Sequence, residues 1–584
     1  MQQKSLERGC GVSISGLAIL VLAVPVQAAA TNPAAAELSP ARNLSTPIAP
    51  GENRLSPNLP KLEISALPES SPRLEWGKTT RLAQQPTAET IQVNKIQVTG
   101  STIFTADKLR SIIQPLEGRV ATRQEIKQAA DAITKMYLDG GYITSRAVVE
   151  PTFSNGIVQI RVIEGTIEQI EIEGTQQLRP KYIRSRLELA TGKPLNAIKL
   201  ENQLRLLRAD PLFSSVEASL RAGSDEGKSI LTVRVKEANV WQGSVGIDNY
   251  SPPAVGSERI TVGVRNLNIT GHGDQFGATY YRTTTGGAEV LDLNYQAPIN
   301  ATNGTLQFRT ALTRNIVTQA PFNIFDLRGE SQLFEATYRQ PVFRSPRQEL
   351  ALSFGFAYQN GQTFTFAGPT PFSIGPDANG LSRTTAFKFG QEYTKRDLNG
   401  AWSARSLFTF GVGLFGATIN THPVPDSLFT SWLGQVQRVQ VLDENNLLIA
   451  QGDLQLSNYS LLPSQQFVIG GGQSVRGFRQ NARAGDSGFR FSVENRINLE
   501  RNAEGVSTLQ VAPFFDAGLV WNADGNPNLL PSQTFLAGLG VGLIWQPLTN
   551  LNVRLDYALP LVNLSDRGTN FQDNGLYFSL GYQF

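Results

Sequence analysis

Cysteine and histidine, which supply much of the chemistry of enzymes and metal sites, are almost missing from this chain of 584 residues. It has one cysteine and two histidines. Cys10 lies in the N-terminal segment that we interpret below as a removed signal, so the mature chain has no thiol for a disulfide, a zinc site or nucleophilic catalysis. His272 and His422 lie in two separate predicted loops. We therefore expect no metal, no other cofactor and no catalytic residues.

Charged residues and long apolar runs are also scarce. Charged residues make up 17% of the chain, and 52 Lys and Arg nearly balance 49 Asp and Glu. Without a basic excess, the composition gives no reason to expect a nucleic-acid partner. After the N-terminal segment, no stretch of about eighteen consecutive apolar residues occurs. If the protein lies in a membrane, it must therefore cross it as strands.

The N-terminus has the pattern of a secretory signal. Lys4 and Arg8 precede an apolar run over 17–26, and Val26-Gln27-Ala28 is typical of a cleavage site. The alternative is a transmembrane anchor, but the run is short for a span and Pro25 stands at its end. We predict a signal peptide over 1–28, followed by a linker over 29–90 that is rich in proline.

Two copies of one α+β pattern follow the linker. The first copy, over 91–165, has a capping box between Thr122 and Glu125 and a helix stop at Gly140-Gly141. The second copy covers 166–239. The predicted elements of the first copy are a strand at 91–99, helices capped by Thr105 and Thr122, and strands at 144–150 and 158–163. Those of the second are a strand at 167–172, helices at 179–189 and 197–208, and strands at 216–220 and 230–236.

This repeated β-α-α-β-β unit resembles the POTRA domain. The alternative is a pair of unrelated α+β modules, which the matched order of elements disfavours.

From residue 240 to 584 the chain reads as one strand after another. Leu551, Val553, Leu555 and Tyr557 would face lipid, while Asn552, Arg554 and Asp556 would face water. We count about sixteen such strands, joined alternately by tight turns and by longer loops at 315–329, 360–380 and 457–487. This rhythm is typical of an antiparallel transmembrane β-barrel with short periplasmic turns and long outer loops. A soluble β-sandwich also alternates, but the signal peptide and the terminal residue favour a barrel in the outer membrane.

The last predicted strand, over 575–584, ends in an aromatic residue. Tyr582 and Phe584 lie on its apolar face together with Leu576, Phe578 and Leu580. This ending resembles the signal that the outer-membrane barrel assembly machinery recognises, and the resemblance implies that machinery as a partner. The alternative is an ordinary last strand.

The segment Val475-Arg476-Gly477-Phe478 follows three consecutive glycines in the longest predicted loop. An arginine held inside a water-filled barrel needs an acidic partner, and Asp516 is the natural candidate. It shares the inner face of its strand with Phe514 and Gly518. The alternative is a glycine-rich surface loop with an unrelated arginine. A further glycine run, at 538–542, lacks the lysine and the helix of a nucleotide loop and suits a lumen face instead.

This pair of motifs resembles the sixth-loop motif of two-partner-secretion transporters (the haemolysin secretion/activation family) and of BamA-type assembly proteins, which share the POTRA-barrel superfamily. The resemblance implies that the loop folds back into the barrel and that Arg476 pairs with Asp516 as a lumen lock. It also implies a function: the POTRA units, in the periplasm, bind the N-terminal secretion domain of a large exoprotein of adhesin or haemolysin type, and the barrel conducts it.

Three functions remain open at this stage. Two repeated units with about sixteen strands favour the two-partner-secretion transporter. A BamA-like insertase usually carries more POTRA units, and a plain diffusion porin has no need of a capture module. Several family members place a plug helix before the first POTRA unit, but the prolines before residue 91 disfavour a long helix here.

Overall fold

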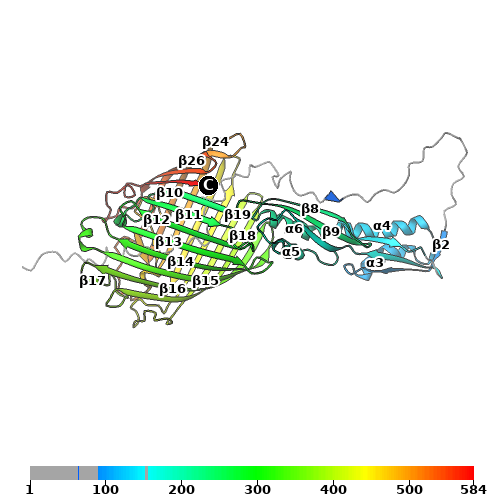
Figure 1. The fold of residues 1–584 in the computed structure, drawn as a ribbon, viewed down its shortest axis with the longest axis horizontal. Coiled ribbons are helices and arrows are strands. Elements are labelled where there is room, and N and C mark those ends of the chain that lie inside the picture. The colour runs from blue at the N-terminus through cyan, green and yellow to red at the C-terminus, as the bar shows by residue number, and fades with distance from the viewer. Residues whose placement is uncertain (1–62, 65–89, 152–154) are drawn as a thin grey trace, which may run out of the picture. The chain divides into compact units, whose positions relative to one another are not determined.

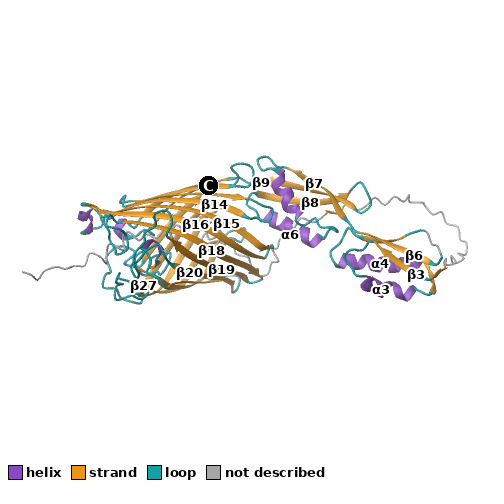
Figure 2. Ribbon diagram, turned by 90° about the horizontal axis from the view of Figure 1, so that it is seen from below, coloured by secondary structure: helices purple, strands orange, loops and turns teal. Residues whose placement is uncertain are grey.

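The computed structural model describes residues 63–64, 90–151 and 155–584 (Figure 1). These residues belong to two compact units, and the chain passes from one unit to the other between residues 238 and 239. The predicted signal peptide and almost all of the predicted linker lie outside the described residues. No helix in the described part of the chain is long and apolar enough to cross a membrane. The helices belong to the N-terminal unit, whereas the second unit is built from strands and loops with a few helical turns (Figure 2).

The first repeat of the N-terminal unit is a three-stranded sheet packed against two helices. The sheet has the order β3-β6-β5, with β3 (Lys95–Thr99) parallel to β6 (Ile157–Ile163) and β5 (Arg146–Val149) antiparallel to it. Helix α3 (Ala106–Ile113) continues into the 3₁₀ turn η2 (Gln114–Leu116), and α4 (Arg123–Asp139) follows. Their apolar faces meet in one buried core that includes Ile126, Ile133 and Tyr137.

The prediction of a single strand over 91–99 is wrong. The segment divides at Asn94 into β2 (Thr90–Val93), which pairs with β4 (Arg119–Thr122), and β3, which pairs with β6. The Asn94 backbone N–H donates to the carbonyl of Gly156 and its side-chain amide donates to the carbonyl of Asn155. These bonds to another turn redirect the chain, and the apolar alternation does not reveal them.

The two predicted helix caps differ in outcome. The Thr122–Glu125 capping box is confirmed, since the Thr122 hydroxyl accepts from the Glu125 N–H and the Glu125 carboxylate accepts from the Thr122 N–H at 2.7 Å. Thr105 stands at the N-cap position of α3 but makes no side-chain capping bond. The predicted stop of the long helix is confirmed at Gly140.

Glu125 gives this helix start a pH dependence. Hydrogen bonds from the Thr122 backbone and from Arg119 lower the pKa of its carboxyl to about 2. Because this folded-state pKa lies below the usual value of about 4.3, the ionised form stabilises the fold above that value, and the contribution is lost as the pH falls toward 2. We expect Glu125→Gln to flatten the dependence of the unfolding midpoint of residues 91–239 on pH in this acidic range. Glu188→Gln, at an exposed position of the helix over 180–188, is the control. An unchanged slope in the Glu125 variant would contradict the expectation.

The second repeat has the same plan. Its sheet has the order β1-β8-β9-β7. Along the chain, helices α5 (Pro180–Glu188) and α6 (Ala197–Arg208) come between β7 and β8. Strand β8 (Phe213–Ala222) is antiparallel to β9 (Lys228–Glu237), and β7 (Thr166–Glu173) is parallel to β9. The two-residue strand β1 (Glu63–Ile64) adds to the other edge of β8, opposite Ser219 and Leu220.

The second unit is a closed antiparallel barrel of sixteen main strands (Figure 1). The first and last strands pair with each other and close it. The short β17 (Gly368–Pro369) extends the hairpin at the end of β16. The main strands are β10 (Trp241–Asp248), β11 (Arg259–Asn266), β12 (Gln275–Thr283), β13 (Ala288–Pro298), β14 (Thr305–Ile316), β15 (Arg328–Arg344), β16 (Gln348–Thr365), β18 (Leu381–Asp397), β19 (Gly400–Val412), β20 (Thr430–Val441), β21 (Asn446–Ser457), β24 (Ser487–Arg501), β25 (Ser507–Trp521), β26 (Phe535–Leu548), β27 (Leu551–Pro560) and β28 (Leu576–Gln583).

The two faces of the barrel wall differ as the alternation predicts. On β27, Leu555 and Tyr557 are exposed on the outer face, whereas Asp556 and Ala558 are fully buried on the inner face. The prediction that Asp556 faces water is therefore wrong, because other groups cover the inner wall at this height. The predicted loop at 360–380 is also shorter than expected, since β16 continues to Thr365.

The loop between β21 and β24 is the part of the barrel unit that matters most for the site. It contains the 3₁₀ turn η5 (Pro463–Gln465) and a small hairpin of β22 (Phe467–Ile469) with β23 (Arg483–Gly485). Two other loops carry 3₁₀ turns, η3 (Pro253–Val255) and η4 (Phe322–Phe325). We call residues 467–485 the motif loop.

Candidate functional site

The motif loop is packed against the inner wall of the barrel rather than extended into solvent. Val475 is fully buried and Phe478 is 4% exposed. Both belong to an apolar cluster with Val520 of β25 and Leu536 of β26. Because these side chains pack as a protein core does, the loop is held to the wall by apolar contact as well as by charge.

The structure brings Arg476 and Asp516 together. The Arg476 Nε donates to one carboxylate oxygen of Asp516 at 2.6 Å and its Nη2 donates to the other at 3.0 Å. The Arg476 backbone N–H adds a third bond to the same carboxylate at 3.1 Å. Arg476 is 5% exposed and Asp516 is fully buried. A bidentate, charge-assisted pair removed from water is among the strongest polar contacts that a protein can form.

The two other predicted inner-wall residues, Phe514 and Gly518, also contact the motif loop. The Arg476 guanidinium lies over the Phe514 ring, with its central carbon 3.2 Å from the ring centroid. This adds a cation–π contact to the ion pair with Asp516. At Gly518, a Cβ atom would lie 3.2 Å from side-chain atoms of Ile469 and Val475. A larger residue there would push the loop away from the wall.

Four further charged residues of the inner wall complete the site, and the sequence analysis did not assign them to it. Glu494 of β24 accepts from Arg476 at 2.8 Å, and it also accepts from Arg496 and Arg554 at 2.9 and 2.7 Å. Arg554 donates to Asp556 at 2.7 Å, and Asp556 lies 3.9 Å from Arg476. Their position on inner faces was readable from the alternation of β24 and β27, but their mutual contact depends on the register between strands.

Backbone contacts fix the height of the motif loop in the lumen. A Cβ atom at Gly538 of β26 would lie 1.9 Å from the carbonyl oxygen of Arg476, so only glycine leaves room for the loop there. Gly477 has a φ of +103°, a conformation that favours glycine. Its N–H donates to the Tyr577 hydroxyl at 2.8 Å, and that hydroxyl donates to the Phe478 carbonyl at 2.6 Å.

The two predicted assembly-signal residues lie at the closure of the barrel, away from the motif loop. Tyr582 lies on β28, and Phe584 comes directly after the end of that strand. Their rings are stacked at a centroid distance of 6.2 Å. Phe584 also continues the closing ladder, since its N–H donates to the Gly243 carbonyl at 3.0 Å and its carbonyl accepts from the Gly243 N–H at 2.8 Å. The last residue therefore pairs with the first strand of the barrel.

The chemistry of the site is ionic and structural. Three guanidinium groups face three carboxylates, so the formal charges of the cluster balance. Within the described ranges, no group of three or more His, Cys, Asp or Glu side chains is placed to hold a metal ion.

Comparisons with known proteins agree with this architecture. The family model described as "Haemolysin secretion/activation protein ShlB/FhaC/HecB" matches residues 227–544, more than half of the chain. The model "POTRA domain, ShlB-type" matches residues 91–165, and the POTRA model "Surface antigen variable number repeat" matches residues 166–238.

Individual relatives are distant but are matched over most of their length. The outer membrane transporter CdiB of Escherichia coli is 25% identical over 464 residues, which cover 77% of this chain and 76% of that protein. The hemolysin transporter protein ShlB of Serratia marcescens is 23% identical over 531 residues, 87% of this chain and 90% of that protein. The solved structure of Escherichia coli CdiB superposes with a TM-score of 0.67 at 21% identity, and the match covers 87% of this chain and 93% of that one.

These matches decide between the three functions that the sequence left open. The predicted POTRA and barrel folds and the predicted outer-membrane location are confirmed, and the protein is a transporter rather than an enzyme. The chain belongs to the haemolysin secretion/activation (ShlB/FhaC/HecB) family, the outer-membrane transporters of two-partner secretion.

Proposed function

We propose that the motif loop occupies the lumen of this transporter as a locked element and that Arg476 and Asp516 form the lock. The observation that carries the proposal is the burial of the Arg476 guanidinium between the wall carboxylates of Asp516 and Glu494. A loop that lay only on the outer surface of the barrel would not place Arg476 in contact with these two buried carboxylates. Secretion then requires the loop to be held here for part of the transport cycle.

We also propose a division of the chain into functional parts. Residues 1–28 are a signal peptide, 29–90 a linker, 91–165 and 166–239 two POTRA domains in the periplasm, and 240–584 the barrel. The cargo is a large exoprotein of adhesin or haemolysin type with an N-terminal secretion domain. In this proposal the POTRA domains bind that domain first, and the barrel then conducts the chain outward.

The edge of the second POTRA sheet supports the binding role. Strand β8 has ten residues. Among the described residues, only Ser219 and Leu220 have a strand partner on its outer side, the short β1. The edge therefore accepts an added strand, and most of it stays open to another extended segment. Addition of a strand to an exposed sheet edge is a common mode of peptide recognition.

Residues 91–239 alone are expected to bind the secretion domain of the exoprotein. The reason is that this fragment contains the open edge of β8 and both complete POTRA cores. Binding is measured by titration calorimetry with the purified secretion domain, and residues 240–584 refolded in detergent serve as the matched control. Binding that requires the barrel, with none to the POTRA fragment, would contradict the capture proposal and leave the lock proposal untouched.

A further inference from the structure

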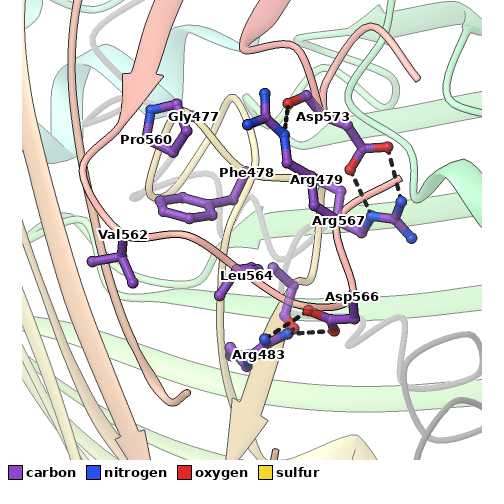
Figure 3. A pocket seen from close by; sticks show the side chains of 11 residues that line it. Gly477, Phe478, Arg479, Arg483, Pro560, Val562, Leu564, Asp566, Arg567 and Asp573 are labelled. Atoms are coloured by element: carbon purple, nitrogen blue, oxygen red, sulfur yellow. Dashed lines mark hydrogen bonds and ion pairs between the residues drawn. The ribbon is translucent and has the colours of Figure 1, made fainter. Parts of the chain in front are cut away.

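A second set of ion pairs holds the motif loop, and it comes from another loop rather than from the wall. Residues 561–575 connect β27 to β28, and we call them the last loop. Arg483 donates to both carboxylate oxygens of Asp566, each at 2.9 Å, and Arg479 donates to Asp573 at 2.9 and 2.8 Å (Figure 3). Both arginines belong to the motif loop, so the two loops are joined by a pair of bidentate contacts.

One side chain of each ion pair is shielded from water. The side chains of Arg483 and Asp573 are each 2% exposed, those of Arg479 and Asp566 23% and 35%. Val562 and Leu564 of the last loop pack on the apolar cluster of the motif loop, as Figure 3 shows beside Phe478. Ion pairs that are shielded in this way are weakened less by salt than exposed ones.

The state of the Asp566 carboxyl fits this role. Its burial raises the pKa, but the hydrogen bonds and charge of Arg483 outweigh burial, so that the pKa lies below the usual value. The carboxyl is therefore ionised at neutral pH, and the pair carries its full charge there.

The last loop also contacts the beginning of the barrel. The Gln572 side chain accepts from the Gln480 N–H of the motif loop at 2.7 Å and donates to the Ser251 carbonyl at 2.8 Å. Asn570 donates to the Ser257 hydroxyl at 2.8 Å. Ser251 and Ser257 lie in the loop after β10. One segment thus contacts both the motif loop and the loop that follows the first strand.

We propose that the last loop is a second anchor of the motif loop, in which Asp566 and Asp573 are positioning residues that act through Arg483 and Arg479. Arg476 fixes the tip of the motif loop on the wall, and the last loop fixes its base. Release of the motif loop then requires both anchors to open. The inference rests on the proposed lock only for its relevance to secretion, because the anchoring itself is a property of the folded barrel.

The test measures loop motion directly in the purified full-length protein. A nitroxide is placed at Gln473→Cys, an exposed position of the motif loop tip, and its spectrum gives the ratio of mobile to immobile label. With Arg476→Ala alone, the second anchor still holds the base and the label stays mostly immobile. When Asp566→Asn and Asp573→Asn are added, we expect this ratio to rise about tenfold or more, the change that about 1.4 kcal/mol produces.

Controls make each outcome decisive. Asp524→Asn in the same Arg476→Ala background removes an exposed carboxylate from the neighbouring loop and should leave the ratio unchanged. Heat-modifiability verifies that each variant is folded. If the triple variant does not fold, either single Asn substitution in the same background is expected to raise the ratio by a smaller amount. A label that is already mobile with Arg476→Ala alone, or that does not respond to the Asn substitutions, overturns the second anchor.

The same set separates this inference from the proposed lock. Loss of secretion by Arg476→Ala with an unresponsive label leaves the lock and rejects the last loop as an anchor. A label that responds to the Asn substitutions, together with normal secretion in every variant, supports the last loop as an anchor and rejects the lock.

Discussion

Arg476→Ala is expected to abolish or sharply reduce secretion of the exoprotein while the barrel still reaches the outer membrane. The substitution removes three hydrogen bonds to Asp516 and Glu494. It leaves Asp516 buried without a cation, whereas Glu494 keeps Arg496 and Arg554. Breaking a buried ion pair from one side costs about 3–5 kcal/mol. That energy lowers the equilibrium constant between the locked and the unlocked loop by roughly two to four orders of magnitude, so that the last loop alone holds the motif loop. Arg476→Lys should fail too, because an ammonium cannot form the bidentate contact.

The measurement compares exoprotein in the medium with transporter in the outer membrane. Arg405→Ala is the matched control, because Arg405 also faces the lumen but lies 3.9 Å from its partner Glu392. It should secrete normally. Normal secretion by Arg476→Ala at a normal membrane level would reject the lock.

Deletion of Phe584 is expected to lower the yield of folded barrel in cells severely. The structure gives this residue two roles, an exposed aromatic ring and a backbone pair with Gly243 at the closing seam. Five residue pairs form the rest of the β10–β28 ladder. The deletion therefore shortens a small ladder, and unpaired backbone groups in lipid cost several kcal/mol each.

Phe584→Ala separates the two roles, since it keeps the backbone bonds and removes only the ring. If assembly factors recognise the ring, Phe584→Ala should accumulate poorly in cells and refold almost normally in detergent, whereas the deletion should refold poorly as well. The readout is the heat-modifiable band in isolated outer membranes and after refolding. If both variants accumulate normally, Phe584 is an ordinary last residue.

Much of this fold could be predicted from local patterns. Alternation along strands gave the barrel, and matched element order gave the two POTRA domains, because each depends on residues close in sequence. Asn94 marks the limit of such reasoning: the break between β2 and β3 depends on bonds to Asn155 and Gly156, about sixty residues away.

The site shows the same division. Arg476 and Asp516 were paired from a motif resemblance, and strand parity placed Phe514 and Gly518 on the correct face. Glu494 was not assigned, because its contact with Arg476 follows from the register between β24 and β25, in which Glu494 lies opposite Phe514. The partners in the last loop were beyond reach for a related reason. Asp566 and Asp573 lie in irregular structure, where neither alternation nor helical spacing indicates direction.

The balanced charges of the lumen cluster have a consequence for how the motif loop can leave. Arg476 is the one cation of the cluster that belongs to the loop, while its carboxylate partners stay on the wall. Departure of the loop would remove one of three positive charges and leave one negative charge in excess, at Asp516, because Glu494 keeps Arg496 and Arg554. Such a step is an ion exchange, favoured when another cation takes the vacated place. A lysine or arginine of the passing exoprotein, or a sodium ion from the lumen water, would serve, which makes the rate of loop exchange a function of salt.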